Sequence, residues 1–213
     1  MPPVQFRLYL VSDRSQTGGR PLGEVIALAS QAGLPAVQVR ERDLPTRELA
    51  ALVRMIRSAV ADRPTRVLVN DRADIALALG ADGVHLRASS LPPGRVRAMI
   101  GPDRLLGVST HSLEEVRRAQ DDGADFVVFG PVYDTPSKHA YGRPQGIDRL
   151  AEVCRIARVP VFAIGGVTPG RAVEARRAGA HGVAVVSSIL SAPDVPAAVR
   201  AFLRALHEAG PSA

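Results

Sequence analysis

The chain has 213 residues with 46% hydrophobic and 23% charged composition, which suits one globular domain over residues 1–213 and argues against disorder. Its net charge of +6 comes from dispersed arginines, and aromatic residues make up only 4%, so a nucleic-acid-binding function is not expected. A single cysteine, Cys154, excludes an internal disulfide, and the chain shows neither a secretion signal nor a membrane-spanning apolar run, so we expect a cytoplasmic protein that does not bind membranes.

Short apolar runs alternate along the chain with longer stretches of helical periodicity. This alternation predicts βα units and a parallel sheet. The predicted strands are residues 6–12, 36–40, 66–70, 83–87, 105–109, 126–130, 159–165 and 182–187. The predicted helices lie near 21–33, 46–62, 72–80, 92–100, 112–122, 147–157, 169–178 and 194–208. Eight βα units in this length favour a closed (β/α)₈ TIM barrel over an open sheet, whose phosphate-binding G-x-G-x-x-G turn is missing after the first strand.

Polar residues lie at the carboxyl end of nearly every predicted strand. They are Ser12, Asp13, Gln38, Arg40, Asn70, Asp71, His85, Arg87, Ser109, His111, Ser187 and Ser188, together with the loop over residues 130–146. Active sites of such barrels lie at the carboxyl ends of the strands. The sequence therefore predicts a polar site at that end of the barrel.

Two close backbone approaches follow the seventh and eighth strands. Gly165 and Gly166 precede a helix that opens at Thr168, and Val186 with Ser187 ends the last strand. Free backbone amides and helix amino-termini at these two positions commonly bind phosphate in such barrels. We therefore expect a phosphorylated small-molecule substrate.

Six ordered motifs resemble the superfamily of thiamine-phosphate synthases and TenI-like thiazole tautomerases. They are VQVRER (37–42), VNDRADIALALGADGVHL (69–86), GVSTHSLEE (107–115), FGPVYDTPSK (129–138), FAIGGVTP (162–169) and VAVVSSI (183–189). The resemblance implies chemistry on a phosphorylated thiazole. It also implies that the phosphate or a neighbouring pyrophosphate is surrounded by Thr135, Ser137, Lys138, Gly165, Gly166, Val186 and Ser187.

The synthase branch of this superfamily, as the resemblance implies, uses magnesium held by two carboxylates to neutralise a departing pyrophosphate. Asp71 matches the first carboxylate, but Ser90 stands where the second is expected. A hydroxyl brings no charge to a hard dication that prefers carboxylates and water. Without that partner, Asp71 is expected to make a structural bond to a strand-end arginine such as Arg40.

The tautomerase branch needs no metal and resembles this chain at both divergent places, the RER run ending at Arg42 and the missing acidic phrase near Ser90. Its reaction moves a proton, which suits a histidine near neutral pH. His111, just past the fifth strand, matches the family's candidate. Lys138, the only lysine, supports phosphate binding in either branch.

The sequence therefore favours a metal-independent thiazole tautomerase, an isomerase with His111 as its proton carrier and no cofactor. The alternatives are a thiamine-phosphate synthase, a transferase whose magnesium site at Asp71 is completed by water, and a noncatalytic regulator that binds a phosphorylated ligand. The predicted substrate-binding residues are Gln38, Arg40, Asn70, Ser109, Thr135, Ser137, Lys138, Gly165, Gly166, Val186 and Ser187. His85 is expected to point into the barrel, Cys154 to lie in the core, and a homodimer is compatible with the sequence.

Overall fold

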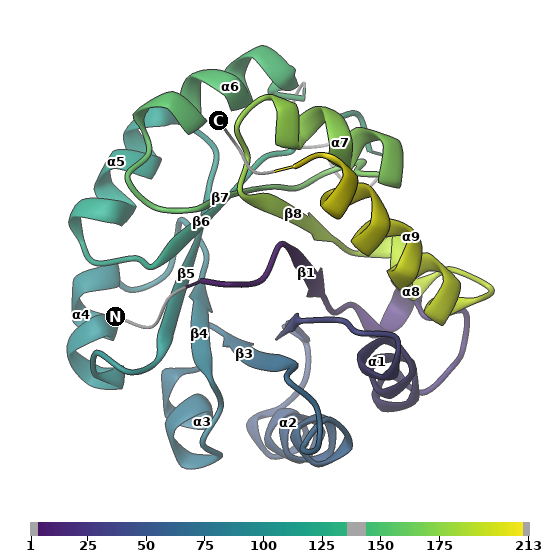
Figure 1. Ribbon diagram of the computed structural model, residues 1–213. Coiled ribbons are helices and arrows are strands. Elements are labelled where there is room, and N and C mark those ends of the chain that lie inside the picture. The colour runs from purple at the N-terminus through teal and green to yellow at the C-terminus, as the bar shows by residue number, and fades with distance from the viewer. Residues whose placement is uncertain (1–3, 136–143, 211–213) are drawn as a thin grey trace.

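The computed structural model describes residues 4–135 and 144–210. Parallel strands close into a barrel in chain order, and helices surround it (Figure 1). The strands are β1 (Leu8–Val11), β2 (Ala36–Val39), β3 (Arg66–Asn70), β4 (Gly83–Leu86), β5 (Leu105–Thr110), β6 (Phe126–Phe129), β7 (Val161–Ala163) and β8 (Gly182–Val185). The barrel closes where β1 pairs with β8, with Leu8 opposite Val183. The predicted TIM barrel is confirmed.

The helices follow the predicted ranges with two additions. They are α1 (Leu22–Gln31), α2 (Thr46–Ala59), α3 (Ala73–Ala78), α4 (Pro93–Ile100), α5 (Leu113–Asp121), α6 (Gly146–Ile156), α7 (Pro169–Arg177) and α9 (Val195–Glu208). The additions are a 3₁₀ turn, η1 (Arg14–Gln16), and a four-residue helix, α8 (Ser187–Leu190), directly after β8. None of the helices in the described part of the chain is both long and apolar enough to cross a membrane.

The strands are apolar on both faces because each face packs against a different layer. One buried cluster joins Tyr9, Phe126 and Phe162 with residues of other strands, and Leu8 and Leu10, on either side of Tyr9, belong to the second cluster shared with the helices. Successive side chains of a strand point to opposite faces, so the aromatic cluster fills the barrel and the second lies between barrel and helices. The interior is therefore packed, and a substrate must bind beyond the strand ends.

Two charged or reactive groups belong to this framework. Asp125, immediately before β6, has an almost fully buried carboxylate that accepts from Arg97 of α4 at 2.5 Å and from the backbone amide of Leu106 at 2.7 Å. Cys154 of α6 packs against the core as expected, and burial raises the pKa of its thiol to about 12. Neither group lies among the strand-end residues, which leaves those residues for binding.

Candidate functional site

Because the strands are parallel and close into one barrel, their carboxyl ends share one mouth. The predicted site residues within the described part of the chain lie in the last residues of these strands or in the loops after them: Gln38, Arg40, Asn70, Asp71, Ser109, His111, Thr135, Gly165, Gly166, Val186 and Ser187. Ser137 and Lys138 lie outside the described residues. The fold thus gathers the candidates at the end of the barrel where such folds bind ligands.

A chain of side-chain hydrogen bonds links β2 to the end of β3. Gln38 Nε2 donates to Asn70 Oδ1 at 2.9 Å, and Asn70 Nδ2 donates to Asp71 Oδ2 at 3.1 Å. Gln38 and Asn70 are buried, with 3% and 7% of their surface exposed, so each must find such partners. These two amides fix the position of the Asp71 carboxylate.

Asp71 has a backbone φ of +59°, the only positive φ of a non-glycine residue in the described chain. Its Oδ1 accepts from the Ser90 hydroxyl and from the backbone amide of Arg87 at 3.4 Å, and its Oδ2 accepts from Arg87 Nε as well as from Asn70. A strained backbone at a strand end that is held by several side chains is typical of functional sites. The expected structural bond to an arginine exists, but the partner is Arg87 at the end of β4 rather than Arg40.

This surrounding does not fit a magnesium ion. Magnesium in proteins takes carboxylate, substrate phosphate and water oxygens in an octahedral arrangement. Both oxygens of Asp71 already accept from donors of the chain, one of them a cation, and Ser90 points its hydroxyl at the carboxylate. Within residues 4–135 and 144–210, no three His, Cys, Asp or Glu side chains are grouped so as to hold a metal ion.

Arg40 and Arg42 add positive charge beside Asp71 and Arg87. The Arg40 guanidinium has no hydrogen-bond partner among the described residues, and its pKa is lowered by burial and by repulsion from Arg42 and Arg87, partly offset by Asp13 and Glu41. A cavity of about 910 Å³ extends from Arg40 and Arg42 towards α1 and α2. These observations indicate a place for an anion at the ends of β2 and β4.

Glu41 and Ser12 were not singled out as a pair by the sequence, yet they support the same strand ends. The Ser12 hydroxyl donates to Glu41 Oε1 at 2.5 Å and accepts from the Arg40 backbone amide at 2.8 Å. Arg14 also pairs with Glu41, at 3.3 Å. The negative charge of Glu41 is therefore neutralised by Arg14 within the fold. The backbone of Arg40 is held by its hydrogen bond to Ser12. Polar residues stand at the alternate positions Gln38, Arg40 and Arg42. This alternation is the feature of the sequence from which the cations Arg40 and Arg42 could be predicted at this strand end.

The two histidines of this end differ in their surroundings. His85 is 1% exposed, bonds Ser109 Oγ through Nε2 at 2.9 Å, and lies against the rings of Tyr9 and Phe126. Burial lowers its pKa to about 3, so it is neutral at physiological pH. The expectation that His85 points into the barrel is confirmed.

His111 is exposed beyond β5 and is held at two points. Its backbone amide donates to Glu115 Oε2 at 2.6 Å, and its Nδ1 lies 2.6 Å from the carbonyl oxygen of Gly130. A carbonyl only accepts, so Nδ1 carries a proton, and in the neutral ring Nε2 keeps a lone pair. The imidazole can thus accept one hydrogen bond from a substrate.

The turn after β7 is tight enough to require glycine. Gly165 and Gly166 have φ of +97° and +63°, and a Cβ on Gly166 would lie 2.4 Å from the backbone oxygen of Asp134. The backbone amides of Gly166 and of Ser187, the first residue of α8, donate to no other described residue. Loops after strands 7 and 8 with a short extra helix commonly hold phosphate in this fold.

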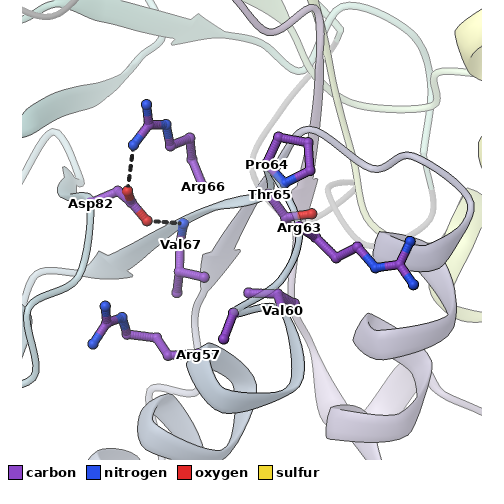
Figure 2. A pocket seen from close by; sticks show the side chains of 9 residues that line it. Arg57, Val60, Arg63, Pro64, Thr65, Arg66, Val67 and Asp82 are labelled. Atoms are coloured by element: carbon purple, nitrogen blue, oxygen red, sulfur yellow. Dashed lines mark hydrogen bonds and ion pairs between the residues drawn. The ribbon is translucent and has the colours of Figure 1, made fainter.

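A second hollow, of about 320 Å³, lies at the opposite end of the barrel, where β3 and β4 begin (Figure 2). Asp82 pairs with Arg66 at 2.8 Å and accepts from the amide of Val67 at 2.8 Å, and Arg57 bonds the carbonyl of Leu79. Groups at this amino-terminal face usually serve stability. We therefore do not place the site there.

The closed parallel barrel and its polar carboxyl-end mouth define the class of (β/α)₈-barrel proteins that bind ligands with their βα loops. Within this class, the chain belongs to the thiamine monophosphate synthase family, which matches residues 8–189.

Similar proteins point to one activity. A thiamine-phosphate synthase of Moorella thermoacetica is 41% identical over 196 residues, covering 92% of this chain and 93% of its own. A Geobacter sulfurreducens protein, provisionally given the same name, is 48% identical over 206 residues and covers 97% of both chains. The solved thiamine phosphate pyrophosphorylase from Pyrococcus furiosus superposes with a TM-score of 0.87 at 32% identity, covering 96% of each chain.

The sequence-based preference for a thiazole tautomerase, an isomerase, is wrong. Relatives at 40–42% identity are thiamine-phosphate synthases, and the superposed structure bears the name of the same activity. The preference depended on the missing carboxylate at Ser90. That residue informs about a metal site, but it does not identify the bond that an enzyme makes or breaks.

Proposed function

We propose that this protein is a thiamine-phosphate synthase that couples hydroxymethylpyrimidine pyrophosphate to a thiazole phosphate. The observation that carries the proposal is a pair of regions in one mouth that offer guanidinium groups, or backbone amides unpaired among the described residues, suited to anions. One follows β7 and β8, with the amides of Gly166 and Ser187, and the other follows β2 and β4, with Arg40 and Arg87. In an eight-stranded barrel β3 lies across from β7, so two anionic substrates can face each other.

The chemistry requires that arrangement. The lone pair of the thiazole nitrogen forms a bond to the pyrimidine methylene carbon, while the bond from that carbon to the pyrophosphate oxygen breaks. The bonding electrons leave with pyrophosphate, and the ring nitrogen becomes cationic. No proton has to be moved by the protein, so catalysis depends on holding the reactants in line and on stabilising the leaving charge.

We assign the thiazole phosphate to the ends of β7 and β8. Backbone amides at a glycine turn and at a helix start are donors suited to phosphate oxygens. Lysine adds a compact point charge for the same group. The proposed phosphate-binding residues are Thr135, Ser137, Lys138, Gly165, Gly166, Val186 and Ser187.

We assign the pyrimidine pyrophosphate to the ends of β2 to β5. Gln38, Asn70 and Ser109 carry the amide and hydroxyl groups of these strands, and Arg40 supplies charge for the pyrophosphate. His111 contacts a substrate through Nε2, because its Nδ1 is bound to Gly130. In this function His111 orients a reactant, and a role as proton carrier is not required.

The proposal is tested with the purified full chain and both substrates, following thiamine phosphate by chromatography and pyrophosphate by phosphorus NMR. We expect equimolar products, and a Lys138→Gln variant that raises KM for the thiazole phosphate about tenfold or more while KM for the pyrimidine pyrophosphate changes little. Arg63→Gln, at the opposite face, is the control of matched charge. Ligand binding with no coupling above the uncatalysed rate, with or without magnesium, would support a noncatalytic binder instead.

A further inference from the structure

The charge balance around Asp71 differs from that of the two-carboxylate magnesium site that the family resemblance implies. Two carboxylates and one magnesium ion sum to zero charge, and so do one carboxylate and one guanidinium. In this chain Ser90 offers a hydroxyl rather than a second carboxylate, and Arg87 pairs its cation with the Asp71 carboxylate. The local charge is thus balanced without a dication.

Arg87 is held on one edge only. Its Nε donates to Asp71 Oδ2, and its backbone amide donates to Ser90 Oγ at 2.9 Å. Its two terminal amino groups donate to no described residue, and 43% of the side chain is exposed. The free edge of a guanidinium is a planar fork that matches two oxygens of a phosphate group.

The Asp71 carboxylate that anchors Arg87 is held by more contacts than an isolated surface ion pair has. The Asp71 carboxylate is only 20% exposed, and its donors reach back through Asn70 to the buried Gln38. Arg40, on the neighbouring side of the mouth, is near enough to Arg87 for mutual repulsion to lower its pKa in addition to the effect of burial. Cations held together in this way are stabilised when a polyvalent anion binds between them.

We propose that Arg87, anchored by Asp71 and Ser90, binds the pyrophosphate leaving group in place of a protein-bound magnesium ion. This inference depends on the proposed synthase function for its substrate. As the carbon–oxygen bond breaks, the electron pair passes to the pyrophosphate oxygen, and hydrogen bonds from the Arg87 fork to nonbridging oxygens stabilise the added charge. No proton is transferred from the arginine, which stays protonated throughout.

Binding of inorganic pyrophosphate, measured by calorimetry in excess chelator, tests this role without requiring turnover. Wild type is expected to bind, and Arg87→Gln is expected to bind about 10- to 100-fold more weakly, since charge-assisted bidentate contacts are lost. Arg63→Gln, at the opposite face, is expected to bind like wild type. Arg87→Lys keeps the charge without the fork, so an intermediate affinity is expected. Arg87 is partly exposed, and a thermal melt of each variant verifies that it folds.

A double variant gives the site two carboxylates and removes the Arg87 cation. Arg87→Ala with Ser90→Asp is expected to regain pyrophosphate affinity by about tenfold or more when magnesium is added, whereas Arg87→Ala alone is not. Wild type that binds pyrophosphate only with magnesium, or Arg87→Gln that binds like wild type, would overturn the inference. Coupling that strictly requires magnesium would overturn it while leaving the synthase function intact. Arg87-dependent pyrophosphate binding without any coupling would support the site and reject the synthase function.

Discussion

Acidification should destabilise this fold through His85, a histidine sealed in the barrel interior. Burial lowers its pKa to about 3, whereas in the unfolded chain it titrates near 6.5. At a pH between these two pKa values, His85 binds a proton in the unfolded state but not in the folded state. The stability that neutral His85 contributes is therefore present in full above pH 6.5 and is lost as the pH falls toward 3. From the two pKa values, the loss between pH 7.5 and pH 5 is about 2 kcal/mol.

Urea unfolding at pH 7.5 and at pH 5, on wild type and on His85→Gln, measures this contribution. Glutamine can still bond Ser109 but does not titrate, so the variant should lose about 2 kcal/mol less on acidification, whatever its stability at pH 7.5. The half-buried His181, whose pKa is also lowered by desolvation, is retained in both proteins and cancels in the comparison. Equal losses in the two proteins, or an imidazole of His85 that titrates near pH 6 by NMR, would refute the reasoning.

Two further substitutions probe the site and the frame. Gly166→Ala should weaken thiazole phosphate binding about tenfold or more, because its Cβ would lie 2.4 Å from a backbone oxygen and the residue has a φ of +63°. Gly170→Ala, where a Cβ on α7 would meet open space, should bind the thiazole phosphate like wild type. Calorimetry measures both affinities. Arg97→Ala should lower the free energy of unfolding by about 3 kcal/mol, because it leaves the buried Asp125 carboxylate without its cation. Arg118→Ala breaks an exposed ion pair on α5 and should lower the free energy of unfolding by less than about 0.5 kcal/mol. Equal effects within either pair would show that the distinction drawn between them is wrong.

The barrel was predictable because its strands carry their pattern locally. Runs such as residues 126–130 are apolar on both faces, and the spacing of helices between them leaves few other arrangements. Helix α8, at four residues, is too short to show periodicity, and it was missed for that reason. The homodimer, the cytoplasmic location and the single domain over residues 1–213 stay predictions.

The site was predictable as a set of positions but less so as a set of contacts. The sequence places Arg40 and Arg87 alike at strand ends. In the structure, Ser90 bonds both the Arg87 backbone amide and the Asp71 carboxylate, and Arg87 is the arginine that reaches Asp71. Ser90 also explains the error in the predicted reaction. In the sequence, the missing carboxylate at Ser90 indicates a different reaction. In the structure, the Asp71 carboxylate is instead paired with the neighbouring cation, Arg87.

The account is tested most directly by a crystal structure of the full chain grown with thiamine phosphate and pyrophosphate. It predicts the ester phosphate within hydrogen-bond distance of the Gly166 and Ser187 amides, and the pyrophosphate on the guanidinium groups of Arg40 and Arg87. Anions bound only in the hollow at the amino-terminal face, beside Arg57 and Arg63 (Figure 2), would contradict it.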